Sequence, residues 1–485
     1  MSGKNRLLIT AFLLAIGLGA CKKWDDHNQV GNPDLKENLM EGLSVNANLS
    51  KFTEYIKKAG LDSLLTSSKT FTVWAPTNDA LQNLDPAILN DVAKLKSFIS
   101  NHIANQSYYT ANAKTQQRVA MLNGKFNNFL GTKIEDANIV RADVPLKNGV
   151  LHVIDKPVMV LPSIWEWINS TTTQYNQNAF IAALNFNFFD STLATIDSIN
   201  ALTGKPIYKP GTGYIVKNMF TEKVHNIKAE EKQFTYFVIT NSGFTTESDS
   251  LKPYYKTTST TVTDTLSKYY TVRDLAVEGI YPASALTGLL SKFGAGILPD
   301  MTTLVETRKL SNGVVHIFNK VDVRTADKFK EIIIQGEFPS GFLSDKTGNT
   351  NYRVRVNPAN NKDFADIMIS GHGVTTYYAY YRLSDIPSIK YRVFALGTND
   401  FQTGTFAQTV VAKTYVPPAT PGGLPTYTTL ASLTHNVPLY TAAGAYNEVN
   451  VGEFTPNNFG ILEIQMTSTA TNPIVLDYLR LVPVP

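Results

Sequence analysis

The sequence predicts a multidomain chain in which two related α+β domains precede an all-β sandwich. The stretch LKNGVLHVI at residues 146–154 returns as LSNGVVHIF at residues 310–318, 164 residues further along. In both copies an Asn-Gly pair leads into an apolar run, which favours a tight turn followed by a strand. Beyond residue 327, short alternating runs are separated by Gly, Asn, Asp and Pro, a pattern typical of a sandwich. At 485 residues the chain exceeds a single core, and about three domains are expected.

The composition is that of a globular protein and gives no sign of a nucleic-acid partner. Apolar residues make up 43% of the chain and charged residues 17%. The formal net charge is +4, and it falls to about +2 if the segment that holds Lys4 and Arg6 is removed. A charge this weak, without a basic stripe, excludes nucleic acid as the expected partner. Cys21 is the only cysteine, so an intrachain disulfide is impossible.

The first 21 residues carry the pattern of an export signal. Lys4 and Arg6 precede an apolar segment, residues 7–18, that is too short to cross a membrane. The tetrapeptide LGAC at residues 18–21 resembles the lipobox of bacterial lipoproteins. This resemblance implies a lipoprotein signal peptide at residues 1–20, lipid attachment at Cys21, and contact with a membrane through that anchor. An ordinary secretory signal with a chance cysteine is the alternative.

The segment after Cys21 is polar and without periodicity, so residues 21–34 are interpreted as a tether. Its charged start, KKWDD at residues 22–26, resembles the export signals of surface lipoproteins in Bacteroidetes-like bacteria. That resemblance implies an outer-membrane lipoprotein of the cell envelope, exposed at the surface. An anchor that faces the periplasm remains open.

The first repeat, residues 35–161, alternates helical and strand patterns. Apolar residues at helical spacing predict a helix over residues 49–59, and Gly60 is placed to end it. A strand follows at residues 71–75, and a second amphipathic helix covers residues 92–103. Three stretches resemble signatures of the fasciclin (FAS1) domain, in the order of that family: FTVWAPTNDA at residues 71–80, FISNHI at 98–103 and NGVLHVID at 148–155. The resemblance implies an α+β domain with a fold signature associated with adhesion.

The second repeat, residues 163–325, resembles a diverged fasciclin domain. The stretch KQFTYFVITN at residues 232–241 matches KTFTVWAPTN at 69–78, and residues 180–184 and 189–193 echo residues 52–56 and 61–65. The spacing between these matches predicts an insertion within residues 194–232, with a hairpin in it, and a smaller one within residues 245–266. Ile239 departs from the pattern, because it stands where the first repeat has Pro76.

Three histidines in the repeats are interpreted as architectural. Aligning Tyr108 with Tyr281 places Leu275 opposite His102. A position that accepts leucine in one copy favours packing over chemistry, because a buried imidazole usually satisfies a backbone group. His152 and His316 lie within apolar strand patterns and receive the same interpretation.

Residues 328–485 predict a sandwich of short strands. The closing stretch PIVLDYLRLVP at residues 473–483 resembles the last strands of jelly-roll carbohydrate-binding modules of the galactose-binding-like group. The resemblance implies an all-β jelly roll behind the two fasciclin-like α+β domains. The resemblance says more about the fold than about the ligand. Such modules often carry a structural calcium, for which Glu337 and Asp477 are candidate oxygen ligands.

Sugar recognition needs aromatic rings, and residues 377–381 (YYAYY) supply them. The candidate ligand-binding residues are Tyr377, Tyr378, Tyr380 and Tyr381. On a strand, Tyr378 and Tyr380 share one face while Tyr377 and Tyr381 share the other, so one pair would belong to the core. The alternative is that all four are packing residues.

No catalytic motif stands out. None of the seven histidines lies within four residues of another, and neither a Gly-x-Ser-x-Gly elbow nor a Walker-type loop is present. We therefore expect no catalytic residues and no enzyme activity. The expected function is adhesion or glycan binding at the cell envelope, as an accessory to polysaccharide capture, with a polysaccharide or a matrix or surface protein as partner. The alternatives are a structural protein–protein interaction module and, least favoured, a glycan hydrolase, which needs two carboxylates about 5–10 Å apart.

Overall fold

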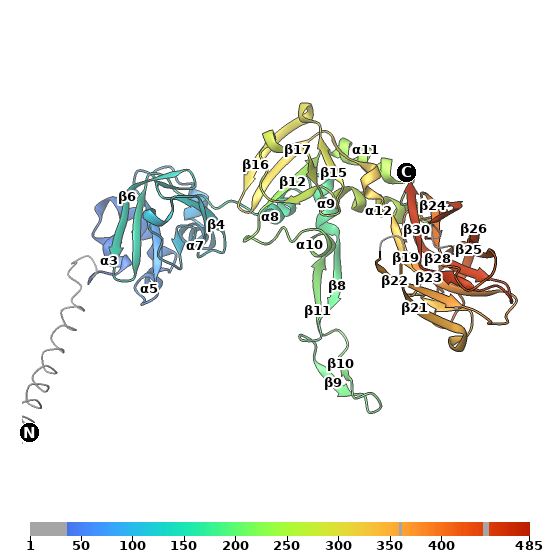
Figure 1. Cartoon of the computed structure of the whole chain (residues 1–485). Coiled ribbons are helices and arrows are strands. Elements are labelled where there is room, and N and C mark those ends of the chain that lie inside the picture. Colours follow the sequence, from blue (N-terminus) through green and yellow to red (C-terminus); the bar gives the residue numbers. More distant parts are fainter. Residues whose placement is uncertain (1–35, 358–360, 440–445) are drawn as a thin grey trace, which may run out of the picture. The chain divides into compact units, whose positions relative to one another are not determined.

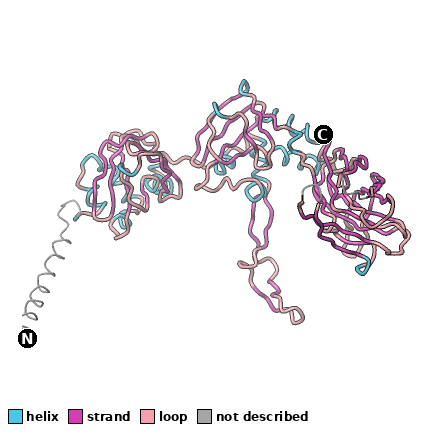
Figure 2. Tube along the Cα trace, in the orientation of Figure 1, coloured by secondary structure: helices cyan, strands magenta, loops and turns pink. Residues whose placement is uncertain are grey.

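The computed structural model describes residues 36–357, 361–439 and 446–485, which form two compact units (Figures 1 and 2). The first unit takes the described residues up to Trp167 together with residues 227–233 and 309–313. The second takes residues 168–226, 234–308 and the chain from Val314 onward. Within the described ranges, no helix is both long and apolar enough to cross a membrane.

The first unit begins with short helices that pack on one sheet. Asn38 starts helix α3 with a capping box, since its side chain accepts the Glu41 N–H and the Glu41 carboxylate accepts the Asn38 N–H. Gly60, at φ +68°, follows the predicted helix α4 at the place expected for a helix end. The helices are α3 (Leu39–Ser44), η2 (Ala47–Leu49), α4 (Ser50–Lys58), α5 (Asp62–Leu65), α6 (Pro86–Leu89), α7 (Val92–Ser100) and η3 (Thr110–Asn112).

The sheet of the first unit has seven strands in the order β2-β1-β7-β6-β5-β4-β3. Every residue of β1 is buried, and β1 runs parallel to β7 with Phe71 opposite Gly149. A central parallel pair buried on both faces explains why both strands are mostly apolar, with Thr72 and His152 as the polar side chains. The strands are β1 (Phe71–Pro76), β2 (Ile103–Ala104), β3 (Gln117–Ala120), β4 (Phe126–Leu130), β5 (Lys133–Ile134), β6 (Ala137–Leu146) and β7 (Gly149–Ile154).

The second α+β region, residues 164–325, repeats the centre of this sheet. Its four-stranded sheet has the order β13-β12-β17-β16. In the alignment of the two repeats, these strands correspond to β2, β1, β7 and β6 of the first sheet. A three-stranded sheet, β14-β15-β18, completes the region. The strands are β12 (Phe234–Ile239), β13 (Ala276–Glu278), β14 (Leu289–Leu290), β15 (Gly296–Pro299), β16 (Leu304–Leu310), β17 (Gly313–Phe318) and β18 (Val321–Val323).

The helices of this region show where the insertions fall. Residues 180–184 echo helix α4 as predicted, but residues 189–193 do not echo α5, because Phe189 ends a strand. Helix α10 instead follows the insertion, and Asn218 caps it. The helices are α8 (Ile164–Ser170), α9 (Asn176–Ala183), α10 (Met219–Lys223), α11 (Asn241–Leu251), α12 (Thr260–Val272), η4 (Ala283–Ala285), η5 (Met301–Thr303) and η6 (Thr325–Lys328).

The first insertion is an arm of two stacked hairpins, which extends from α9 and α10 in Figure 1. Its inner ribbon pairs β8 (Asn185–Phe189) with β11 (Tyr214–Asn218), and its outer ribbon pairs β9 (Ile196–Ile199) with β10 (Pro206–Tyr208). The arm therefore spans residues 185–218, starting before the predicted 194 and ending well before 232. At its base the Asn218 amide donates to Asn185 Oδ1 over 3.1 Å.

Residues 245–266, interpreted as a second insertion, lie mostly in α11 and α12. Leu251 and Tyr255 are fully buried in the same apolar cluster as sandwich residues. The Lys328 ammonium, at the start of the sandwich segment, lies 2.6 Å from the Asp274 carboxylate, and both side chains are fully buried. The helices of the second region and the following segment thus share one core.

The rest of the second unit is a sandwich of antiparallel sheets. Their orders are β19-β30-β24-β27, β20-β23-β28-β25-β26 and β21-β22-β29. Residues of the first two sheets, among them Val393 and Ile464, belong to one apolar cluster. The strands are β19 (Ile332–Gln335), β20 (Gly341–Phe342), β21 (Thr350–Val356), β22 (Asp363–Ile369), β23 (Tyr377–Ile386), β24 (Lys390–Leu396), β25 (Phe406–Val416), β26 (Thr426–Val437), β27 (Val449–Phe454), β28 (Gly460–Ser468), β29 (Ile474–Leu476) and β30 (Tyr478–Val484); η7 (Thr347–Asn349) precedes β21.

Candidate functional site

The four candidate tyrosines divide between the two faces of strand β23. Tyr377 and Tyr381 are 0% and 2% exposed, and their hydroxyls donate to Ser344 O and Gly336 O. These two are core residues and not ligand contacts, which corrects half of the predicted set. The physical reason is the two-residue period of a strand, which sends alternate side chains into the core. Tyr378 and Tyr380 remain half-buried on the opposite face.

The outward face of the five-stranded sheet collects polar and aromatic side chains around these two tyrosines. The register places Arg382 opposite Glu463, and Lys413 opposite Glu463 on the other side. We call this set the aromatic face; its members are Tyr378, Tyr380, Arg382, Lys413, Tyr415, Tyr427, Glu463 and Gln465. Three strands and the edge strand β26 therefore contribute to one surface.

Arg382 is the centre of the aromatic face. Its guanidinium lies 4.7 Å from the Tyr380 ring centroid and 4.2 Å from that of Tyr415. Its Nε donates to Glu463 Oε2 over 2.8 Å. Attraction between the guanidinium and the two ring faces holds the Tyr380 and Tyr415 rings against it. The Tyr427 ring meets Tyr415 edge to face, with centroids 5.5 Å apart.

Glu463 is a buried charge beneath this surface. It is 1% exposed, and its second oxygen accepts the Gln465 amide over 2.8 Å. Although partial burial opposes it, the Glu463 charge raises the pKa of Arg382 above its ordinary value. Burial, with the nearby Glu463 charge, also raises the pKa of Tyr378. The Tyr378 phenol is therefore neutral at neutral pH and lies near the Arg382–Glu463 ion pair.

This arrangement has the groups that sugar binding uses. Rings such as Tyr380, Tyr415 and Tyr427 can stack on the C–H faces of a sugar, and the ion pair offers donors and acceptors to hydroxyls. The sequence interpretation found Tyr378 and Tyr380 but missed the other members. The two-residue period alone would have added Arg382. The residues on β25, β26 and β28 could be found only with the strand register.

The candidate calcium ligands are Glu337 and Asp477, and the charge of Glu337 affects the pKa of Asp477. Burial raises the pKa of Asp477 to about 7, and the charges of Asp366 and Glu337 contribute. Glu337 Oε2 is buried without a hydrogen-bond partner. Both features would be relieved by a cation. In the ranges that the structure describes, however, no group of three or more His, Cys, Asp or Glu side chains is arranged to hold a metal ion. Calcium therefore stays a prediction.

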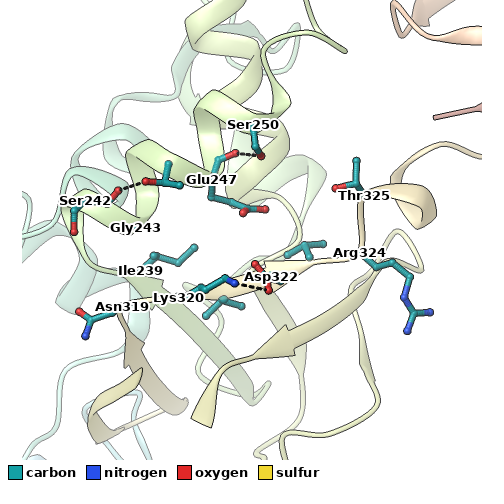
Figure 3. A pocket seen from close by; sticks show the side chains of 13 residues that line it. Ile239, Ser242, Gly243, Glu247, Ser250, Asn319, Lys320, Asp322, Arg324 and Thr325 are labelled. Carbon is teal, nitrogen blue, oxygen red and sulfur yellow. Dashed lines mark hydrogen bonds and ion pairs between the residues drawn. The ribbon is translucent and has the colours of Figure 1, made fainter. Parts of the chain in front are cut away.

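A separate groove of about 700 Å³ lies between α11 and the segment that contains β18 (Figure 3). Two carboxylates line it, those of Glu247 and Asp322. Burial raises the pKa of Glu247, to which Asp322 adds, and the Glu247 carboxylate accepts the Val323 N–H. Asp322 lies 3.2 Å from the Lys320 ammonium. Each carboxylate thus has a partner within the protein, which favours a structural role for both.

The three histidines interpreted as architectural are buried and bonded to the backbone. His102 is fully buried, with Nδ1 2.9 Å from Phe98 O and Nε2 2.9 Å from the Val158 N–H. Burial lowers its pKa to about 4. His152 and His316, also fully buried, place Nε2 2.9 Å from Tyr108 O and Tyr281 O respectively. These contacts agree with the architectural interpretation.

The predicted anchor cannot be compared with the structure. Cys21, the signal peptide at residues 1–20 and the tether at residues 21–34 lie outside the described residues.

Comparison with known proteins identifies a fasciclin domain in the first unit. Residues 47–160 match the family model of the fasciclin domain. Over 131 residues the chain is 29% identical to Protein sll1483 of Synechocystis, which covers 25% of this chain and 72% of that protein. A second Synechocystis protein, sll1735, is 23% identical over 130 residues, covering 25% of this chain and 98% of its own length. The predicted fasciclin domain at this position is confirmed.

Similarity to solved structures is weaker. The FAS1 domain pair of the insect cell adhesion molecule Fasciclin I is 17% identical, covers 59% of this chain and 99% of its own, and has a TM-score of 0.24. A family 35 carbohydrate-binding module from Clostridium thermocellum is 13% identical, covers 32% of this chain and 100% of its own, and has a TM-score of 0.21. The chain is a multidomain, strand-rich protein that contains a fasciclin domain at residues 47–160.

Proposed function

We propose that this chain is a non-catalytic binding protein of the bacterial cell envelope whose sandwich holds a polysaccharide on its aromatic face. The observation that carries the proposal is the set of rings around the Arg382–Glu463 pair, with Arg382 within 4.7 Å of Tyr380 and 4.2 Å of Tyr415. Since that ion pair neutralises itself and Lys413 adds one positive charge, a neutral or weakly acidic glycan is the expected ligand.

The second α+β region is proposed to be a second fasciclin-like domain, and the sandwich a jelly roll. Support for the former is a set of hydrogen bonds that recurs in both regions. The Thr72 hydroxyl accepts the Tyr108 N–H over 2.8 Å, and the Thr235 hydroxyl accepts the Tyr281 N–H over 2.9 Å. Two fasciclin-like domains would serve adhesion or spacing beside the sugar-binding module.

The chain is further proposed to be a lipoprotein anchored through Cys21 in the outer membrane and exposed at the surface. The support is the lipobox-like tetrapeptide at residues 18–21. Tethering a binding module raises the local concentration of its ligand at the cell surface, which suits an accessory role in polysaccharide capture. Mass spectrometry of the mature N-terminus would test the anchor, and an unacylated first residue elsewhere than Cys21 would refute it.

The glycan proposal is tested by retention on insoluble polysaccharides and by affinity electrophoresis in soluble ones. The probes are xylan, mannan, cellulose and pectin, and the protein is the mature chain with Cys21→Ser. We expect retention on at least one of them and a loss of at least tenfold in affinity for Tyr380→Ala and Tyr427→Ala. Tyr352→Ala is the matched control, because Tyr352 is 58% exposed on a different sheet of the same sandwich. Absence of retention on every polysaccharide, or an equal loss in the control, would refute sugar binding.

A protein–protein interaction module is the second candidate. Its supporting observation is an apolar row on the edge strand β21, where Tyr352, Val354 and Val356 are 58%, 78% and 58% exposed. Alternate residues of a strand share one face, so these three side chains form a continuous stripe. If Tyr352→Ala and Val354→Ser impaired adhesion of whole cells while Tyr380→Ala did not, the protein module would replace the glycan module.

A further inference from the structure

The arm at residues 185–218 exposes apolar side chains along its whole length. Its two ribbons have only two strands each, and such ribbons are marginally stable in water without a covering layer. The exposed apolar residues are Phe188 (40%), Phe189 (37%), Leu193 (60%), Ile196 (56%), Ile199 (58%), Leu202 (98%), Ile207 (45%), Tyr214 (58%) and Val216 (68%). A gathering of this kind on one protruding element marks a contact surface.

These side chains lie on both sides of the arm. Phe188 and Phe189 are consecutive in β8, so they point to opposite faces of the inner ribbon, and both are exposed. Phe189 lies opposite Tyr214, which belongs to its face, and Phe188 lies opposite Ile215 on the other. A ribbon that rests on a partner's flat surface needs only one apolar face. A ribbon that is apolar on both faces is suited to being surrounded.

Aromatic and aliphatic residues are sorted along the arm. The rings cluster where the two ribbons meet: between ring centroids, Phe189 of β8 lies 5.2 Å from Tyr208 of β10 and 5.4 Å from Tyr214 of β11. Farther from this ring cluster, the outer ribbon and its turn carry exposed aliphatic residues, with Leu202 the most exposed at 98%. Aliphatic side chains prefer the hydrocarbon of a membrane, whereas Tyr and other amphipathic rings prefer its headgroup level.

Lysines complete the pattern. Lys205 and Lys209 are exposed on the outer ribbon. The Lys217 ammonium lies 4.0 Å from the centroid of the Phe188 ring and pairs with Glu222 over 3.1 Å, so Lys205 and Lys209 are the lysines available to lipid. A lysine beside an apolar surface extends its ammonium toward lipid phosphates while its stem stays on the apolar side. The negative charges of Asp190 and Asp197 offset these lysines, so attraction of the arm to anionic lipid is expected to be modest.

We propose that the tip of the arm, residues 193–209, inserts into the outer layer of a lipid membrane. Its aliphatic side chains enter the boundary between headgroups and acyl chains, and the rings of the inner ribbon lie at the headgroups. Insertion is shallow, because the ribbon edges carry unpaired backbone groups that must keep water or headgroup partners. This contact does not depend on lipid attachment at Cys21 or on sugar binding by the sandwich.

The test uses a fluorescent label at the tip. Cys21 is the only cysteine, so residues 21–485 with Cys21→Ser and Leu202→Cys accept a single environment-sensitive dye such as nitrobenzoxadiazole. This form keeps every described residue and lacks both the apolar N-terminal segment and an acyl chain. With vesicles of phosphatidylethanolamine and phosphatidylglycerol (3:1), we expect at least a twofold rise in emission with a blue shift. Spin-labelled lipids with shallow quenchers should reduce that emission more than lipids with deep ones.

The matched control places the same dye at Leu424→Cys. Leu424 is 88% exposed on a loop of the sandwich, so it reports non-specific adsorption of an exposed leucine site. Its emission should not change. In flotation assays, Ile199→Ser with Leu202→Ser should reduce vesicle binding at least tenfold while far-ultraviolet circular dichroism stays the same.

Three results would overturn the proposal. The first is unchanged emission at position 202 with both anionic and phosphatidylcholine vesicles. The second is an equal change at position 424. The third is an emission change at position 202 that grows with protein concentration in the absence of vesicles, because a second copy of the chain would then cover the arm.

Discussion

The two α+β regions share the hydrogen bonds of the Asn that directly precedes strand β7 or β17, and they differ in the other elements of each region. In the first, the Asn148 side chain accepts the Leu39 N–H and donates to Leu65 O and Ser67 O. In the second, the Asn312 side chain accepts the Ile164 N–H and donates to Ile227 O and Ala229 O. One buried amide in each region thus joins three parts of the fold. These are the first residue of helix α3 or α8, the start of strand β7 or β17, and the segment that precedes strand β1 or β12.

The differences lie outside this framework. His102, which bonds to two backbone groups in the first region, has Leu275 at the aligned position in the second. The second region also gains the arm and the helices α11 and α12, which share a core with the sandwich. The comparison indicates that the hydrogen bonds of Asn148 and Asn312 carry the shared fold, while the added elements distinguish the second region.

The largest expected effect comes from removing the buried amide. Asn148→Ala and Asn312→Ala each abolish three hydrogen bonds and leave backbone groups unpaired, so each should destabilise its region by about 2–4 kcal/mol. Hydrogen exchange of β7 and β17 amides, resolved by mass spectrometry, measures the loss in each region. Asn436→Ala, at an exposed position, should have no effect. If only one of the two Asn variants were destabilised, the regions would not be equivalent.

The next effect tests His102 against its counterpart. His102→Leu should cost about 1–3 kcal/mol, because the Val158 N–H loses its acceptor. The native pKa of about 4 lies below the unfolded value of 6.5, so the unfolded chain binds more protons between these values. Stability of the first unit should therefore fall as the pH drops from 6.5 to 4, and less steeply in the variant. A pH profile identical to that of the parent would contradict the neutral, buried state of His102.

Asp477 should show the opposite pH dependence in the second unit. Its native pKa of about 7 lies above the ordinary value of 3.8, so the folded state binds the extra proton. Between pH 6 and pH 8, stability should decrease by about 1.4 kcal/mol in the parent and stay flat in Asp477→Asn. Calcium titration of the same two proteins tests the predicted metal site. Stabilisation by calcium in the parent alone would support it, and no stabilisation in either would remove it.

The smallest expected effect is that of deleting the arm. The inner ribbon ends at the Asn185–Asn218 pair, which a two-residue Asn-Gly turn can join directly. Because the removed strands pair only with each other, the free energy of unfolding should change by about 0.5 kcal/mol or less. Denaturant unfolding measures it. A loss of several kcal/mol would show that the arm belongs to the framework after all.

What the sequence revealed depended on whether a pattern was local. The Asn-Gly strands and the split of the tyrosines on β23 follow from turn chemistry and the two-residue period, and the structure agrees with both. The predicted insertion begins at residue 194, after the observed start of the arm at residue 185. The stretch NFNFF at residues 185–189 has no turn signal before it, and its partner strand lies on the other side of the tip in the sequence. Its pairing is non-local, and periodicity alone cannot reveal it.

Helices α11 and α12 show the other limit. Residues 245–266 are rich in Thr and Ser, which are weak helix formers, so the composition of this predicted insertion does not indicate two helices. Burial of Leu251 and Tyr255 in the shared core outweighs those preferences. The sequence does not predict the whole aromatic face for a related reason. Glu463 and Tyr427 contact Arg382 only because of the strand register, and they lie 81 and 45 residues from it in the sequence.

The buried pair of Lys328 and Asp274 has a practical consequence for dissecting the protein. Composition suggests a cut at residue 328, yet a fragment that begins there would carry Lys328 without its carboxylate and would strip Tyr255 from the core it fills. Separating two buried charges is more damaging than lacking both. A fragment for crystallisation or ligand screening should therefore start ahead of α8, because Asn312 accepts the Ile164 N–H, and should keep the second α+β region and the sandwich together.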